Sequence, residues 1–143
     1  MICPKFYDDI DDNKLKFAVI VSMYNNKWVL CKHKDRSTYE WPGGHRENGE
    51  DIIQTAQREL YEETGAIDFD IQKICVYSVF DDINETYGML YFAKIKQFGE
   101  LPDFEMEHIK LFDDLPENWT YPETHAVLLQ KVSEALQESS FMR

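Results

Sequence analysis

A glycine turn that leads directly into a strongly acidic helix is the feature that most constrains this chain. Residues 44–66 begin with glycine and later carry Glu59, Glu62 and Glu63. Their spacing of i, i+3 and i+4 places all three carboxylates on one side of a helix. At about 100° per residue, Glu63 falls among the apolar residues, on the side that must face the core. The stretch therefore predicts a helix that turns an acidic edge toward the interior.

An acidic row on the inward edge of a helix needs a neighbouring positive charge. Like charges on adjacent turns repel, and an unpaired carboxylate loses its hydration when it is buried. Clustered carboxylate oxygens are the ligands that hard divalent ions such as Mg²⁺ or Mn²⁺ prefer. On the same helical wheel, Gln54, Arg58 and Tyr61 turn toward water. The competing interpretation is an ordinary acidic helix on a solvated face, which three glutamates alone do not exclude.

The stretch resembles the Nudix box, Gly-x5-Glu-x7-Arg-Glu-U-x-Glu-Glu-x-Gly-U, in which U is a bulky aliphatic residue. All of its fixed positions are matched, by Gly44, Glu50, Arg58, Glu59, Leu60, Glu62, Glu63 and Gly65. The one departure is Ala66, where U is usually larger. Because Ile67 follows at once, we expect this departure to alter packing more than chemistry. The resemblance covers roughly residues 15–138.

The resemblance implies a ligand set for Mg²⁺ within the box. The implied ligands are three side chains and one backbone carbonyl: Glu59, Glu62, Glu63 and Gly44. Glycine at positions 43 and 44 lets the backbone come close, which a side chain would prevent. Arg58 resembles the family arginine that pairs with Glu50 and braces the box. The alternative for Arg58 is the same ion pair without a part in catalysis, and both interpretations give it a supporting role.

The box does not fix the general base that would accept a proton from the attacking water. Family members draw the base from the box or from a later acidic loop, and a more basic carboxylate or a more acidic metal-bound water would serve. Here that loop carries Glu105 and Glu107. We take Glu105 as the expected base, with Glu107 or a box glutamate as alternatives. The non-catalytic interpretation is that both are solvated loop acids.

Segments outside the box indicate a branch of the family. Residues 33–36, 39–44 and 111–118 are similar to the corresponding parts of MutT-type 8-oxo-dGTP diphosphatases, particularly the YtkD-like group of Gram-positive bacteria. The resemblance implies that Arg36 and Lys34 meet the distal phosphates of a nucleotide substrate.

The same resemblance suggests how a base would be held. In MutT-type enzymes an asparagine of this loop reads the purine edge, which Asn118 would do here. The alternative for Asn118 is a turn residue or a helix cap, a common role for asparagine. Trp119, Tyr121 and Phe80 are candidates to stack on a base. Their alternative is a place in the core, which is commoner for aromatic residues.

The hydrophobic pattern predicts a mixed sheet. Residues 17–24 are apolar on both alternations, which is typical of a central strand covered on both faces. Asn25-Asn26 suits a two-residue hairpin. Further strands are expected over 27–32, 71–80, 87–96 and 109–112, with a hairpin turn at 81–85 and a loop at 33–42 leading to a glycine turn at 43–44.

Two helices complete the predicted α/β fold. The box helix is expected to begin at a cap on Asn48 or Gly49 and to end near Gly65. A final amphipathic helix should start near Pro122, with its apolar positions at Leu128, Leu129, Val132 and Leu136. Two helices around a mixed β-sheet give an α/β/α sandwich, which is also the Nudix layout. We expect one domain over residues 1–143.

Composition limits the partners. The formal net charge of −12 repels long polyanions, so long nucleic acid is not expected to bind. A small anionic nucleotide remains a suitable substrate if metal ions reverse the local charge. No apolar run approaches the roughly 18 residues of a membrane span, and the first residues do not resemble a signal peptide. A cytoplasmic protein without a membrane partner is therefore expected, and no oligomeric state follows from the sequence.

Cysteine and histidine residues show no pattern of ligands. The cysteines are odd in number and include no Cys-x-x-Cys pair: Cys3, Cys31 and Cys75. This count favours neither disulfides nor a zinc site, and we expect Cys31 and Cys75 to be small buried hydrophobic residues. The histidines lack ligand spacing and are expected to be structural or at the surface: His33, His45, His108 and His125.

These features together predict Mg²⁺-dependent hydrolysis of a nucleoside triphosphate to a nucleoside monophosphate and pyrophosphate. The expected substrate is an oxidised purine nucleotide such as 8-oxo-dGTP. One alternative is a Nudix pyrophosphatase that cleaves a nucleotide sugar or the 5′ end of RNA. The other is a Nudix module that binds a nucleotide and regulates a partner without hydrolysis. The complete set of box glutamates argues against the last.

Overall fold

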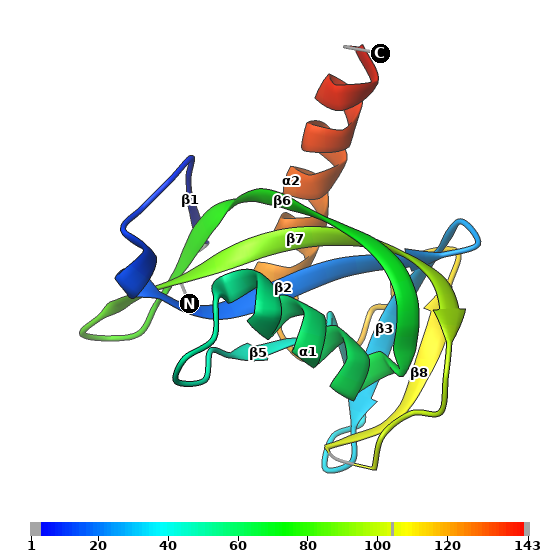
Figure 1. Cartoon of the computed structure of the whole chain (residues 1–143). Helices are drawn as coiled ribbons and strands as arrows, with labels where there is room; N and C mark the ends of the chain where they lie inside the picture. The colour runs from blue at the N-terminus through cyan, green and yellow to red at the C-terminus, as the bar shows by residue number, and fades with distance from the viewer. Residues whose placement is uncertain (1–3, 104, 142–143) are drawn as a thin grey trace.

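An eight-stranded mixed sheet lies between two helices in the computed structural model, which describes residues 4–103 and 105–141 (Figure 1). Cys3 falls outside the described residues. The strands are β1 (Lys5–Tyr7), β2 (Leu15–Tyr24), β3 (Lys27–His33), β4 (Tyr39–Glu40), β5 (Gly43–His45), β6 (Ala66–Phe80), β7 (Glu85–Phe98) and β8 (Met106–Phe112). The helices are α1 (Ile52–Thr64) and α2 (Pro122–Phe141), with a short 3-10 turn, η1 (Asp12–Lys14).

Strand β2 is the centre of the sheet. It pairs in parallel with β7 and antiparallel with β3 and β5. Ala18 and Ile20 face one hydrophobic core, and Val19 and Val21 face the other. The prediction of a strand buried on both faces is therefore confirmed. The predicted hairpin after β2 is also present, with positive φ values of 50° at Asn25 and 63° at Asn26.

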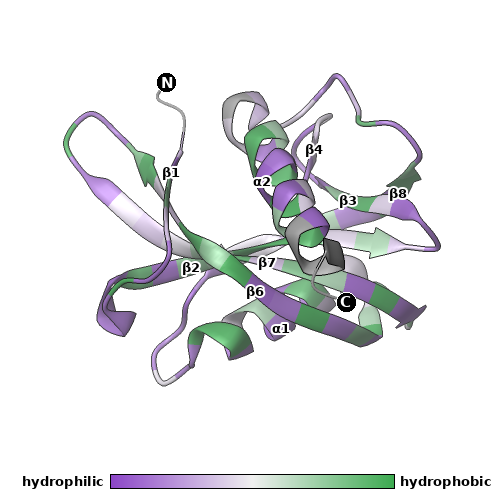
Figure 2. Cartoon of the chain, turned by 90° about the horizontal axis from the view of Figure 1, so that it is seen from above, coloured by the Kyte–Doolittle hydropathy of each residue, from purple (hydrophilic) through white to green (hydrophobic). Residues whose placement is uncertain are grey.

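The two helices cover opposite faces of the sheet, as Figure 2 shows from above. Helix α1 packs Ile52, Ala56 and Leu60 into the core that contains Ala18. Helix α2 packs a second apolar stripe into the other core, through Leu128, Leu129 and Val132 with Leu136 at its edge. This arrangement is the expected α/β/α sandwich with a mixed sheet.

The start of α1 differs from the prediction. Asp51 is the N-cap, with extended backbone angles, and its N–H donates to Gln54 Oε1 at 2.8 Å. The predicted caps were wrong, because Asn48 and Gly49 form a turn before the helix, where Gly49 has a φ of 83°. The end was predicted correctly. Gly65 has a φ of 79° and donates its N–H to Tyr61 O.

Several strands extend beyond their predicted bounds. Both long strands of the β6–β7 hairpin continue past the apolar stretches that indicated them, because cross-strand hydrogen bonds also hold polar residues. The expected glycine turn at 43–44 was wrong, since Gly43 and Gly44 belong to strand β5 and pair with β2. Strands β1 and β4 were not predicted, and they are too short to show a period of two.

Two further findings bear on the predictions. Cys31 and Cys75 are free and buried, as expected of small hydrophobic residues. Within the described part of the chain, every helix is too short or too polar to cross a bilayer.

Candidate active site

Strand β5 holds the box glycines against the box glutamates of helix α1. The backbone N–H of Gly43 donates to Glu63 Oε1 at 2.7 Å. A Cβ atom at Gly44 would lie 2.4 Å from the carboxyl carbon of Glu59. Glycine at position 44 therefore leaves the space against β5 that the carboxylate of Glu59 occupies. Glu63 is 6 % exposed, which agrees with its predicted place on the inward side of α1.

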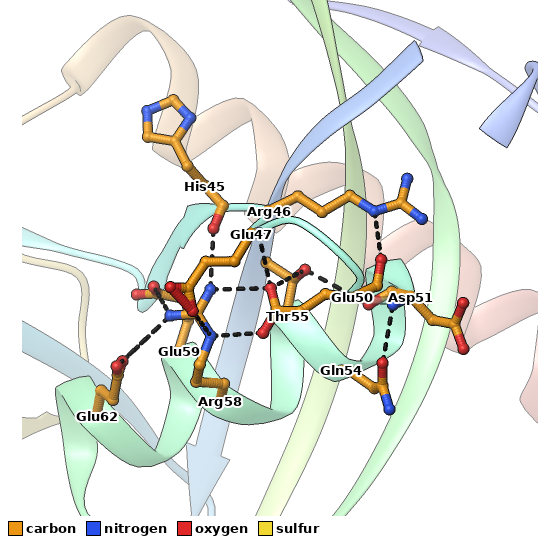
Figure 3. A network of polar contacts seen from close by, with 10 residues as sticks. All are labelled: His45, Arg46, Glu47, Glu50, Asp51, Gln54, Thr55, Arg58, Glu59 and Glu62. Atoms are coloured by element: carbon orange, nitrogen blue, oxygen red, sulfur yellow. Dashed lines mark hydrogen bonds and ion pairs between the residues drawn. The ribbon is translucent and has the colours of Figure 1, made fainter. Parts of the chain in front are cut away.

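Arg58 joins the acidic residues into one network (Figure 3). Its Nε donates to Glu50 Oε2 at 2.6 Å, which is the contact that the box resemblance implied. Its Nη1 donates to Glu59 Oε1 at 2.6 Å and lies 3.2 Å from Glu62 Oε2. Its Nη2 donates to the carbonyl of His45 at 2.9 Å. The guanidinium thus braces the turn before the helix and two of the box carboxylates at once.

The prediction that Arg58 turns toward water was wrong. Its side chain is only 25 % exposed. A helical wheel places the Cα–Cβ direction, but a long arginine side chain can bend over the helix surface toward charges on either side. Here the carboxylates around it decide the direction.

The carboxyl groups fall into two electrostatic classes. Hydrogen bonds from Arg58 are the main reason why the pKa of Glu50 falls to about 2. Burial is the main reason why the pKa of Glu59 rises to about 7 and that of Glu63 to about 9. Neighbouring carboxylates raise both values further. Glu50 is therefore a structural anion, whereas burial leaves Glu59 partly and Glu63 largely protonated at neutral pH.

A pocket of about 320 Å³ opens over these groups. It is lined by Arg58, Glu59, Glu62, Glu63 and Glu105. Glu105 arrives from the loop before β8, which is tied to the chain by a hydrogen bond from Lys34 N to Glu105 O at 2.9 Å. Glu107 instead forms an ion pair with Lys32, and the hydrogen bond from that lysine lowers the pKa of Glu107. The fold thus brings Glu105 to the box glutamates and leaves Glu107 outside the pocket.

The donor chemistry of this pocket fits a hard divalent ion. Its acceptors are carboxylate oxygens, and the raised pKa values of Glu59 and Glu63 show that their ionised forms are poorly stabilised without a further cation. Among residues 4–103 and 105–141, no three His, Cys, Asp or Glu side chains already converge as a metal-ligand set. Arg58 draws Glu59 and Glu62 toward itself while Glu63 faces β5, so convergence on an ion requires these carboxylates to rotate.

A second, largely apolar pocket of about 390 Å³ lies beside strand β5. Gly43 and Gly44 line it together with the polar side chains of Glu40 and His125. Its apolar walls come mainly from aromatic residues, which include Phe17, Trp41, Tyr77, Phe80 and Tyr121. Because the same glycines contact Glu59 and Glu63, strand β5 connects this apolar pocket to the acidic one.

The predicted base-stacking residues separate into two groups. Phe80 and Tyr121 line the apolar pocket. Trp119 is not among the lining residues and packs against Trp41 and His125, with ring centroids 5.6 Å and 6.1 Å apart. The structure therefore places Phe80 and Tyr121 where they can meet a base, and Trp119 in the surrounding packing.

The structure does not bring Asn118 into either pocket. Its side-chain Nδ2 donates to the backbone carbonyl of Ser37 at 3.1 Å, and its backbone carbonyl accepts from the N–H of Tyr39 at 3.0 Å. Both bonds tie one loop to another, which agrees with the alternative interpretation of Asn118 as a turn residue. A base-reading role for Asn118 stays a prediction, and it would require the side chain to leave Ser37.

The two predicted phosphate-binding residues lie near different pockets. Arg36 Nη1 donates to Glu40 Oε1 at 2.9 Å, and its guanidinium carbon lies 5.8 Å from the ring centroid of Tyr121. It therefore borders the apolar pocket. Lys34 is exposed and pairs with Asp103 at 2.6 Å, beside the loop that carries Glu105.

The sequence assigned no role to Glu40, and it predicted His125 only to be structural or at the surface; the structure places His125 in the interior. Glu40 directly precedes the buried Trp41, in a segment that was noted only for its family resemblance. His125 lies three, four and seven residues before buried residues of α2, so its helical spacing carried a signal of burial. Burial lowers the pKa of His125 to about 3, which keeps its ring neutral at physiological pH.

Comparison with known proteins agrees with this geometry. A profile of the NUDIX domain matches residues 14–131. YtkD of Bacillus subtilis, to which an 8-oxo-dGTP diphosphatase activity has been ascribed, is 34 % identical over 114 residues. The matched region covers 79 % of this chain and 72 % of that relative.

Solved structures show the same fold. The B. subtilis pyrophosphohydrolase BsRppH, in a mutant form, has a TM-score of 0.81 and 28 % identity, with 98 % of this chain and 93 % of that chain covered. The NUDIX domain of Shewanella oneidensis NrtR, solved with ADP-ribose, has a TM-score of 0.67 and 19 % identity. The match covers 85 % of this chain and 88 % of that chain. The latter likeness supports the fold alone. With an intact box whose glutamates line one acidic pocket, this chain belongs to the Nudix hydrolase family.

Proposed function

We propose that this protein is an Mg²⁺-dependent nucleoside triphosphate diphosphatase that releases a nucleoside monophosphate and pyrophosphate. The preferred substrate is an oxidised purine nucleotide such as 8-oxo-dGTP. One observation supports the proposal: the β5 glycines that line an apolar aromatic pocket also contact Glu59 and Glu63, which line an acidic pocket. A nucleotide has the same two parts, a phosphate chain that needs cations and a flat base that needs apolar walls.

The acidic pocket would hold the ion. The ligands would be the carboxylates of Glu59, Glu62 and Glu63 and the carbonyl of Gly44. When bound, Mg²⁺ neutralises phosphate charge and makes a bound water more acidic. Mn²⁺ has similar ligand preferences and is expected to substitute.

The remaining residues of the pocket have separate tasks. Glu105 reaches the pocket from a different segment and would accept the proton of the attacking water. Arg58 keeps the box carboxylates in place through its contacts with Glu59, Glu62 and Glu50. Phosphoryl transfer asks little more of a protein than positioning and charge stabilisation, so these tasks suffice.

The substrate itself would span both pockets. Phe80 and Tyr121 would contact the base, and Lys34 beside the Glu105 loop would meet the phosphates. Arg36 borders the base pocket, so the predicted contact of Arg36 with a phosphate would require its guanidinium to leave Glu40. Free nucleotides of this kind occur in the cytoplasm, where we expect the protein to act.

A second candidate is removal of pyrophosphate from a longer triphosphorylated substrate, such as the 5′ end of RNA. The likeness to the B. subtilis pyrophosphohydrolase favours it. The net charge of −12 opposes it, because a long polyanion would be repelled outside the metal site.

A substrate panel with and without Mg²⁺ tests the proposal. With the metal, 8-oxo-dGTP should be hydrolysed far faster than dGTP, ADP-ribose or triphosphorylated RNA, and a chelator should abolish the reaction. Faster turnover of the RNA would replace the first candidate by the second. Undiminished activity after chelation would remove the proposed role of the acidic pocket.

A further inference from the structure

The polar side chains that line the apolar pocket include Glu40, Thr124 and His125, each of which is almost fully buried. Glu40 is 8 % exposed and His125 is 5 % exposed, and both line this pocket among aromatic residues. Buried polar groups normally have hydrogen-bond partners within the protein, because a lost hydrogen bond costs free energy. Polar atoms that face a pocket are therefore candidates to bind polar atoms of a ligand.

A backbone contact fixes the tautomer of His125. The N–H of Trp41 donates to His125 Nδ1 at 3.2 Å, so Nδ1 must be the unprotonated nitrogen. A neutral ring then carries its proton on Nε2, which makes this atom a donor. In the described parts of the chain, His125 Nε2 has no hydrogen-bond partner. Every fully enclosed polar side-chain atom among these residues does have a partner. His125 Nε2 is therefore not fully enclosed by the protein, and the residue lines the pocket.

Glu40 supplies an acceptor beside this donor. Arg36 binds its Oε1 at 2.9 Å, while Oε2 has no hydrogen-bond partner among residues 4–103 and 105–141. An ionised carboxylate only accepts hydrogen bonds. Glu40 is also next to Trp41 in the chain, and the N–H that binds the His125 ring belongs to the peptide group joining these two residues. Glu40 and His125 are thus linked through one peptide group, and both line the same pocket.

We infer that this pair reads the edge of a 6-oxopurine base, that is guanine, 8-oxoguanine or hypoxanthine. His125 Nε2–H donates to the O6 atom, and Glu40 Oε2 accepts from N1–H, with the 2-amino group of guanine as a second donor. Adenine presents the opposite pattern, with a donor at N6 and an acceptor at N1, so both contacts would be repulsive. The inference rests on the proposed nucleotide substrate and names the residues that choose its base.

Binding of nucleoside monophosphates tests the inference without catalysis. Calorimetry on the whole protein, with no metal added, should give the affinity order GMP, then IMP, then AMP. A site built around a donor and an acceptor rejects the mismatched base strongly, so AMP should bind at least about tenfold more weakly than GMP. AMP binding as tightly as IMP, or no binding of GMP, would overturn the inference.

The variant Glu40→Gln tests the acceptor directly. Arg36 should hold the amide oxygen in place of Oε1, which turns the amide NH₂ group toward the base and replaces an acceptor by a donor. The ratio of GMP to AMP affinity should then fall by about tenfold or more. The matched control is Glu134→Gln, the same change at an exposed position of α2, which should keep the wild-type ratio. An unchanged ratio in Glu40→Gln contradicts the assignment.

A second readout does not depend on Glu40. In a ¹⁵N spectrum of the free protein, His125 should show a protonated Nε2 and an unprotonated Nδ1, and GMP but not AMP should shift the Nε2–H signal. The opposite tautomer would overturn the donor role. Hydrolysis of triphosphates is measured separately: its absence sinks the proposed function, whereas hydrolysis without any guanine preference in binding sinks this inference alone.

Discussion

The two pockets that adjoin strand β5 are built in different ways. Four of the residues that line the acidic pocket, Arg58, Glu59, Glu62 and Glu63, come from two turns of helix α1. The residues that line the apolar pocket extend from Phe17 to His125. They come from strands β2, β4, β5 and β6, from the start of α2 and from the connecting residues Trp41 and Tyr121. Helical spacing alone groups the first set, whereas the second set meets only when the sheet has its correct register and α2 covers it.

This difference suggests that the two pockets respond differently to mutation. Changes in the acidic pocket should affect chemistry and leave folding intact, because its charged groups add little to the core. Changes in the apolar pocket should affect stability and base preference, because its walls belong to the core itself. The following predictions test this contrast in order of decreasing effect.

The largest effect is expected for Glu63→Gln. The amide can still accept the N–H of Gly43, and it resembles the protonated acid that a pKa of about 9 implies, so the fold should be retained. Loss of a metal-binding charge should lower kcat/KM by on the order of 10³-fold. Steady-state kinetics with Mg²⁺ and thermal unfolding check both parts. Wild-type turnover in this variant would rule out the metal role of Glu63.

A smaller effect on chemistry should distinguish the two loop acids. Glu105→Gln removes the proposed proton acceptor and should lower kcat by about 10²-fold or more. Glu107→Gln is the matched control, since this side chain is exposed, lies outside the pocket and pairs with Lys32. Its kcat should stay within about threefold of the wild-type value. The reverse order would move the base to Glu107.

A pair of glycine substitutions sharpens the contrast between the pockets. In Gly44→Ala, the new Cβ meets the carboxylate of Glu59, which is the flexible end of a side chain and can move. Activity should fall by about tenfold or more at little cost in stability. In Gly88→Ala, the new Cβ would lie 2.1 Å from the ring of Phe17, a wall of the apolar pocket. Stability should fall by about 1–3 kcal/mol. Kinetics and denaturant unfolding of both variants would show whether the effects separate in this way.

The pH dependence of stability should report the burial of His125. Its pKa is about 3 in the folded protein against an ordinary value of 6.5, so the unfolded state binds more protons between these values. Stability from this group is present above pH 6.5 and is lost as the pH falls toward 3, by up to about 1.4 kcal/mol per pH unit. Urea unfolding across this range should give a steeper slope for the wild type than for His125→Gln. Equal slopes would show that His125 does not contribute.

The smallest effect is expected for Asn118→Ala. If Asn118 contacts the base, KM should rise several-fold and the preference among purine nucleotides should weaken, because a hydrogen bond to the substrate is lost. If it serves only the loop through Ser37, the substrate profile should be unaltered. A comparison of kcat/KM for 8-oxo-dGTP and dGTP in this variant decides between the two roles.

Most of the fold could be predicted because it follows from local patterns. The buried strand at 17–24 and the apolar stripe of α2 both show a periodicity that neighbouring residues suffice to reveal. Strand β5 could not be predicted, since Gly43 and Gly44 read as a turn and become a strand only through pairing with β2. The direction of Arg58 was missed for the same reason, because surrounding carboxylates, not its wheel position, orient the guanidinium.

By itself, the sequence determined the family and the acidic helix, and it predicted the residues that we propose as ligands of a metal ion. These depend on residue types at fixed spacings within 23 positions, and helix geometry converts such spacings directly into proximity. Only the tertiary structure decided that Glu105 rather than Glu107 joins the box, and that Glu40 and His125 meet in an aromatic pocket. These residues come together only through the strand register and the packing of α2, and both are set by contacts between residues far apart in the chain.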